Sequence, residues 1–234
     1  MKVRIKFSKE GPVKFVGHLD TMRYFQKAIR RANLPVAFSG GYSPHMIMSF
    51  AAPLGVGTEV WESTSIWSWQ RQFLLQRSQD VWMQYGRRVH VLSTRQVEDG
   101  KAGKAMSLVA AADYYVEFRP GKEPEISWKD KISDFLAQPE IKVMKKTKRS
   151  EKEIDIRPFI YKMELQGDKI FMMLASASAN YTKPELVTDT FFSWLGIELP
   201  EFAYSIKRLE VYADKGTEEE HKFVTLEALG EEVE

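Results

Sequence analysis

The hydrophobic pattern at the start of the chain changes from the period of a strand to that of a helix and back. Val3, Ile5 and Phe7 alternate with Lys2, Arg4 and Lys6, which predicts a half-buried strand with a basic outer face. Residues 19–33 follow a helical period, and residues 36–39 and 46–51 are again extended. The apolar stripe of the predicted helix consists of Leu19, Met22, Phe25, Ile29 and Ala32.

A second copy of this order follows further along the chain. Residues 114–118 alternate as a strand, residues 128–137 form a short amphipathic helix, and residues 204–212 form a final strand. Pro184 and Gly196 mark the ends of another helix. We therefore predict an α+β fold of two ferredoxin-like β-α-β-β-α-β halves. The predicted parts are residues 1–110, residues 111–213 and a disordered acidic tail at 214–234.

Residues 61–90 follow neither period. They hold four of the six tryptophans, namely Trp61, Trp67, Trp69 and Trp82. The stretch WESTSIWSW can be encoded so that a neighbouring frame reads GEYFDMELA, an alternating strand. We hypothesise two compensating frameshifts, with the frame restored near Val91, and assign these tryptophans no function. The alternative is an aromatic platform that stacks nucleic-acid bases. An intact frame on resequencing, with the same tryptophans in close relatives, would contradict the frameshifts.

The charge of the chain is unevenly distributed. The net charge is +2, but residues 1–50 carry nine Lys and Arg against two Asp and Glu. Residues 142–152 carry six against one, whereas residues 214–234 carry eight acidic residues against two lysines. Two basic zones favour an anionic partner for the body of the protein, and the alternative is a set of solvated faces.

Composition excludes several classes of protein. The chain has no cysteine, so it forms no disulfide and holds no iron–sulfur cluster through thiolates, and we expect a cytoplasmic protein. No apolar run approaches the roughly 18 residues that span a bilayer, so no membrane partner is expected. The N-terminal residues alternate as a strand and lack the apolar block of a signal peptide. We expect no cofactor.

Three side chains in the first basic zone are candidates for chemistry. His18 and Asp20 lie at the start of the predicted helix, and His45 follows Pro44 in a turn. Two histidines and a carboxylate can bind a metal or act as acid and base, but their spacing matches no metal signature. The alternative is structural, with His18 and Asp20 capping the helix and His45 ordering the turn by hydrogen bonds.

The same zone offers groups that bind phosphate. Arginine and lysine neutralise phosphates, and hydroxyls and glycine-backed amides add donors. Tyr42 and Phe50 are candidates for stacking on bases. Arg157 and Lys183 in the second half are candidates to extend an anion site, with Asp155 expected to pair with one of them. The remaining candidates are Lys14, Arg23, Lys27, Arg30, Arg31, Ser39 and Ser43. A solvated basic helix face is the alternative.

Several stretches resemble a known bacterial family. These are KFVGHLDTMRYFQKAIRRANLP, FSGGYSPHMIMSFAAPLGVG, LVAAADYYVEF, KEIDIRPFI and the segment from Asn180 to Pro184. They resemble a radical-SAM-associated family known as a domain of unknown function. The resemblance covers residues 1–60 and about 91–212, and it departs at 61–90. It implies a radical-SAM protein as a fused or neighbouring partner, with this chain recognising a substrate such as RNA.

Three functions remain open at this point. The first is a binding module that holds RNA or a phosphorylated substrate for the radical-SAM partner. The second is a metal-independent endoribonuclease with His18 or His45 as general base, by analogy of fold alone. The third is a subunit whose basic face docks on the partner protein without nucleic acid.

Overall fold

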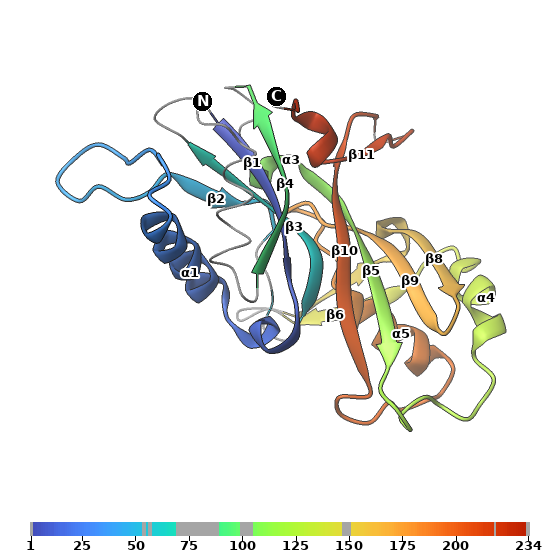
Figure 1. The fold of residues 1–234 in the computed structure, drawn as a ribbon. Helices are drawn as coiled ribbons and strands as arrows, with labels where there is room; N and C mark the ends of the chain where they lie inside the picture. Colours follow the sequence, from blue (N-terminus) through green and yellow to red (C-terminus); the bar gives the residue numbers. More distant parts are fainter. Residues whose placement is uncertain are drawn as a thin grey trace. The chain divides into compact units, whose positions relative to one another are not determined.

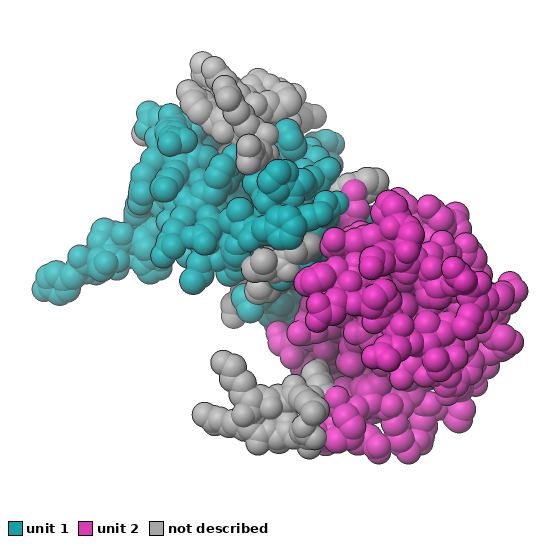
Figure 2. Space-filling model, turned by 90° about the horizontal axis from the view of Figure 1, so that it is seen from below, with its two compact units in different colours: residues 1–111, 208–234 teal, residues 112–207 magenta. Residues whose placement is uncertain are grey.

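The computed structural model describes residues 2–52, 55, 58–68, 89–98, 105–146, 151–217 and 219–232. It is a mixed α+β protein with a large, mostly antiparallel sheet and a few helices (Figure 1). The chain divides into two compact units, residues 1–111 with 208–234 and residues 112–207 (Figure 2). Strands β5 (Val109–Phe118) and β10 (Tyr204–Asp214) each contribute residues to both units.

In the N-terminal part of the chain, the described residues of the first unit form four antiparallel strands. They are β1 (Lys2–Lys9), β2 (Met48–Phe50), β3 (Glu59–Ser68) and β4 (Val89–Val97). Strand β1 pairs antiparallel with β3 and β4, and β2 pairs antiparallel with β3. The strand order is β4-β1-β3-β10-β5. The helical elements are η1 (Gly11–Phe15), α1 (His18–Arg31), α3 (Ala105–Leu108) and η5 (Glu227–Leu229).

Helix α1 forms where the helical period predicts it. Gly17 is its N-cap, and Asp20 lies in the first turn, where a carboxylate interacts favourably with the helix dipole. Asn33 ends the helix with a φ of 51°, and the Leu34 N–H donates to the Ile29 carbonyl across the turn. The sequence therefore determines both ends of this helix locally.

The apolar face of α1 packs on the sheet through aromatic rings. Phe25 is fully buried, and its ring centroid lies 4.8 Å from Phe7, 5.8 Å from Phe50 and 5.5 Å from Trp67. The predicted stripe is correct for Phe25 but wrong for Leu19, which is 61% exposed in the first turn. Periodicity identifies a helix face, whereas the extent of the covering sheet decides which residues on that face are buried.

The second face of β1 is also buried, which corrects the prediction of a basic outer face. Arg4 and Lys6 are only 1% and 8% exposed. Lys6 Nζ pairs with Glu210 Oε2 at 2.8 Å and with Glu227 Oε2 at 2.9 Å, and Arg4 donates to the Leu226 carbonyl. Alternation along a strand predicts two faces, but it does not predict that the far end of the chain covers one of them.

Strand β3 occupies the first part of the stretch that follows neither period. Residues 63–67 are buried, and Trp67 packs against Phe25 as part of the core. The printed sequence therefore forms a strand here, and Trp67 acts in packing. Residues 69–88, which include Trp69 and Trp82, lie outside the described residues. The frameshift hypothesis for 61–90 stays a prediction.

The acidic C-terminal segment contains regular structure where we predicted disorder. Strand β11 (Phe223–Thr225) pairs antiparallel with β10, opposite residues 212–214. His221 Nδ1 lies 2.6 Å from an oxygen of Asp214, and the side chain of Leu226 is fully buried. The composition of this segment alone favours disorder. The segment is nevertheless ordered, because one apolar side chain is buried and several acids pair with cations of the sheet.

In its described residues, the second unit contains the remaining strands and two further helices. Its helices are α4 (Ile132–Leu136) and α5 (Pro184–Trp194), with the short turns η3 (Lys129–Lys131) and η4 (Arg157–Phe159). Its strands include β8 (Ile160–Gln166) and β9 (Lys169–Ala175), which form an antiparallel hairpin around Gly167. The strand order is β10-β5-β9-β8. Trp128, Phe135, Phe191 and Phe192 form an aromatic core.

A separate hairpin interrupts this unit. Strands β6 (Lys142–Lys146) and β7 (Glu151–Asp155) pair only with each other among the described strands. A ferredoxin-like half does not contain such a hairpin, so the structure differs here from the simple repeat that we predicted. In the described part of the chain, no helix is long and apolar enough to cross a membrane.

Asp155 ties the base of this hairpin, which gives a prediction on pH. Its Oδ1 accepts the N–H groups of Ile141 at 2.8 Å and Arg157 at 2.9 Å, and these hydrogen bonds lower the pKa of the carboxyl. The stability that Asp155 contributes is therefore present above the unfolded pKa of about 3.9 and is lost as pH falls through the lowered folded value. The melting temperature of the wild type should fall below pH ~4 more steeply than that of Asp155→Asn. Parallel pH profiles would contradict this.

Candidate nucleic-acid interface

Four cationic side chains share one exposed face of α1. Successive residues of a helix turn by about 100°, so the four fall within about 100° of the circumference, opposite the buried Phe25. Asp20 is the one acid of the helix, and it pairs with Arg23 at 2.9 Å through side chains that are both mostly exposed. A surface pair of this kind contributes little to stability. We call Arg23, Lys27, Arg30 and Arg31 the α1 stripe.

Residues 39–45 form a closed loop that projects beyond the C-terminal end of α1 (light blue in Figure 1). Phe38 and Met46 form a β-bridge at its base. The Ser39 hydroxyl lies 2.8 Å from His45 Nδ1 and accepts the His45 N–H at 3.1 Å. Gly41 has a φ of 96°, a left-handed conformation that glycine adopts without steric cost. We call residues 39–45 the SGGYSPH loop.

The tip of the SGGYSPH loop presents an aromatic ring to solvent. Tyr42 is fully exposed, and Ser43 next to it is exposed as well. An exposed tyrosine on a loop held by internal hydrogen bonds offers a flat surface for stacking at a low cost in conformational entropy. The loop and the α1 stripe follow each other in the chain and belong to the same unit.

The remaining N-terminal candidates have structural contacts. Lys14 Nζ pairs with Glu59 Oε1 at 2.8 Å, which ties η1 to β3. His18 is the first residue of α1, and its ring packs edge-on against Phe50 at 5.1 Å. These contacts place His18 and Phe50 in packing, and Lys14 in an ion pair within the unit.

The structure does not bring His18, Asp20 and His45 together as one cluster. His18 and Asp20 lie in the first turn of α1, a helix about 20 Å long. His45 lies in the SGGYSPH loop, beyond the other end of that helix (Figure 1). Within the described ranges, no group of three or more His, Asp or Glu side chains is placed to hold a metal ion. His45 instead closes its loop through Ser39, which is the structural alternative considered above.

The candidates in the second unit also serve the fold. The Arg157 guanidinium donates to the carbonyls of Leu136 at 2.7 Å and Ile160 at 3.3 Å, so two of its nitrogens are engaged by backbone. Asp155 accepts the Arg157 backbone N–H rather than pairing with its side chain. Lys183 is exposed at the N-cap position of α5. Of this set, Lys183 is the residue whose position suits contact with an anion.

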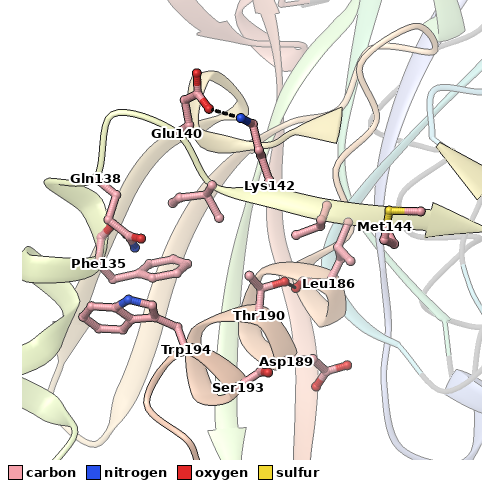
Figure 3. A pocket seen from close by; sticks show the side chains of 12 residues that line it. Phe135, Gln138, Glu140, Lys142, Met144, Leu186, Asp189, Thr190, Ser193 and Trp194 are labelled. Carbon is pink, nitrogen blue, oxygen red and sulfur yellow. Dashed lines mark hydrogen bonds and ion pairs between the residues drawn. The ribbon is translucent and has the colours of Figure 1, made fainter. Parts of the chain in front are cut away.

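The second unit contains a pocket that the sequence did not predict. It has a volume of about 490 Å³ and lies between α4, β6 and α5 (Figure 3). Phe135 and Trp194 pack together at one end, and Trp194 is 42% exposed. Glu140 and Lys142 at the rim neutralise each other at 2.5 Å. The pocket therefore suits an apolar or aromatic group better than a phosphate. The feature of the sequence that points to this pocket is the aromatic residue at the end of α5.

Residues 2–184 match a family described as an uncharacterised protein conserved in bacteria (DUF2344). The chain belongs to this family. The match covers β1, the α1 stripe and the SGGYSPH loop, and it ends at the start of α5.

Comparisons with curated proteins and with solved structures assign no function to the chain. No curated protein matches the chain. A chain of a solved structure titled "Crystal Structure of a Cbf5-Nop10-Gar1 Complex" is similar at 14% identity, with a TM-score of 0.44. The similarity covers 89% of this chain and 48% of the other, so the chain spans about half the length of that protein.

Proposed function

We propose that this protein binds RNA through the α1 stripe and the SGGYSPH loop, as an accessory to a radical-SAM partner. The observation that carries the proposal is a stripe of four exposed cations followed by a loop with a fully exposed tyrosine at its tip. Arginine and lysine on such a stripe contact phosphates, and the aromatic ring stacks on a base. The motif resemblance described above supports the radical-SAM partner.

We also propose that each half is a ferredoxin-like unit. The orders β4-β1-β3-β2 and β10-β5-β9-β8 support this, because each places the fourth strand beside the first and the third between the first and second. Residues 69–88, which join β3 to β4 in the chain, lie outside the described residues and do not enter this argument. In the second half, the β6–β7 hairpin is an insertion between α4 and β8.

Binding is favoured over cleavage by the arrangement of the histidines. A metal-independent nuclease needs a base close to the attacking 2′-hydroxyl and groups that stabilise the transition state. The two histidines lie at different ends of α1, and the Nδ1 of His45 is engaged by Ser39. This geometry supports a binding surface rather than a cluster of catalytic groups.

The test is a salt series of RNA binding with the double variant Arg30→Ala/Arg31→Ala. Each phosphate contact with a single strand contributes about 0.7 to the slope of log K against log salt, so the loss of two contacts should flatten the slope by about 1.4. The measurement is fluorescence anisotropy of a labelled single-stranded RNA. Both arginines are exposed, so the variant should keep the melting temperature of the wild type.

The matched control removes two exposed cations elsewhere, in Lys122→Ala/Lys215→Ala. It changes net charge equally and should leave the slope almost unchanged. Equal slopes in the two double variants would contradict a site on α1. If RNA fails to bind even at low salt, the basic face becomes a candidate surface for docking on a protein.

A further inference from the structure

A row of three cations lies on the face of the sheet opposite α1. Arg4 and Lys6 are neighbours on that face of β1, and Arg95 on β4 is the register partner of Arg4. Burial lowers the pKa of Arg4 to about 10, which shows the cost of holding its charge away from water. We call Arg4, Lys6 and Arg95 the cationic row.

The C-terminal residues 226–232 cover the cationic row, and we call them the strap. Glu227 lies between two members of the row, with Oε2 2.9 Å from Lys6 Nζ and Oε1 3.6 Å from Arg95 Nε. Glu232 adds a second carboxylate to Arg95 at 2.9 Å, and Arg4 donates to the Leu226 carbonyl. Every member of the row thus has an acceptor supplied by the strap.

The strap is attached to the sheet at its edge. Gln96 of β4 and Glu231 exchange two backbone hydrogen bonds at 3.0 and 2.8 Å. Gly230 approaches β4 so closely that a Cβ atom there would lie 2.6 Å from the Cβ of Arg95. Leu226 anchors the other end, since its side chain is fully buried. Displacing the strap therefore costs the burial of Leu226, and any replacement must offset that cost with contacts to the row.

The chemistry of the strap is that of a polyanion. Its carboxylates contact lysine and arginine as phosphate oxygens do, through charge-assisted hydrogen bonds. Among the described ion pairs of the row, Glu210 belongs to the sheet, whereas Glu227 and Glu232 belong to the strap. Displacement of the strap removes the contacts of Glu227 and Glu232 and leaves that of Glu210. The row lies within the matched family region of residues 2–184, whereas the strap lies beyond it.

We propose that the cationic row is a second RNA-backbone site and that the strap occupies it as an intramolecular competitor. This rests on the proposed RNA-binding function, and it adds a site and a means of controlling it. RNA phosphates replace Glu227 and Glu232 on Lys6 and Arg95, and the strap leaves the edge of β4. The strap lowers affinity for RNA until a strand long enough to reach the row displaces it.

The test compares Glu227→Gln/Glu232→Gln with the charge-matched Glu220→Gln/Glu231→Gln, whose two side chains are exposed in the same C-terminal segment. The first variant loses the carboxylates that hold the row, and it should bind single-stranded RNA more tightly than the second. The salt slope should steepen by about 0.7 for each newly contacted phosphate of the single strand. Addition of Arg95→Ala should reduce the gain, because it removes one of the two cations that the phosphates contact. Equal affinities and slopes in the two double variants would overturn the proposal.

A second measurement uses the wild-type protein and does not depend on how the variants fold. Saturation with RNA should accelerate amide exchange at Gln96 and Glu231, because their mutual hydrogen bonds open when the strap leaves. Unchanged protection of both amides in the saturated complex would overturn displacement of the strap.

Failure of this inference differs from failure of the proposed function. If Arg30→Ala/Arg31→Ala weakens RNA binding but the strap variants match their control, the α1 site stands and the cationic row is structural. If the strap variants gain affinity while the α1 variant loses none, RNA binds the row and not α1.

Discussion

Replacing Phe25 with alanine should lower the free energy of unfolding of the first unit by about 3–5 kcal/mol. The ring is fully buried and lies within 6 Å of Phe7, Phe50 and Trp67, so its removal leaves a cavity that rigid aromatic neighbours cannot fill. A loss of this size is a large share of the stability of a domain. Urea unfolding followed by circular dichroism measures it.

Leu19→Ala is the matched control, because Leu19 lies on the same helix and in the same apolar stripe of the sequence. Its side chain is 61% exposed, so the loss should stay within about 0.5 kcal/mol. Comparable losses at both positions would show that the apolar stripe packs as the sequence pattern predicts, and would contradict the structure at the first turn of α1. A loss near zero for Phe25→Ala would contradict the core itself.

Replacing Tyr42 with alanine should weaken RNA binding by about 1–3 kcal/mol, which is the usual contribution of one base stacked on an aromatic ring. This corresponds to a rise in Kd of roughly 5-fold to 150-fold. The melting temperature should not change, because the ring is fully exposed and packs on nothing in the core. The salt slope should also stay the same, since the substitution removes no charge. Anisotropy titrations across a salt series measure both quantities.

Tyr42→Phe keeps the ring and removes the hydroxyl, so it should bind RNA nearly as well as the wild type. If Tyr42→Phe and Tyr42→Ala lose affinity equally, the hydroxyl and not stacking carries the contact. If neither loses affinity, the SGGYSPH loop is not part of the RNA surface, and the α1 stripe alone would account for binding.

The sequence predicted the α1 stripe and the SGGYSPH loop better than it predicted the roles of single residues. A helical period is a local property, so the sequence pattern alone predicts that Arg30 and Arg31 share an exposed helix face. Lys14 and Arg157 carry the same charge, yet Lys14 forms an ion pair with Glu59 and Arg157 binds backbone carbonyls. Glu59 lies 45 residues from Lys14, and Leu136 lies 21 residues from Arg157. No pattern of charges along the chain identifies these partners.

The sequence by itself determined where α1 begins and ends, the alternation of β1 and the glycine-rich turn, because each depends on interactions between near neighbours. The tertiary structure decided which faces meet water. Arg4 and Lys6 look solvent-facing in the sequence, but the strap from the other end of the chain buries them. Leu19 looks buried but is exposed, and the acidic tail forms a strand because Leu226 and Glu227 find partners on a distant sheet. Burial depends on long-range packing, which no local pattern encodes.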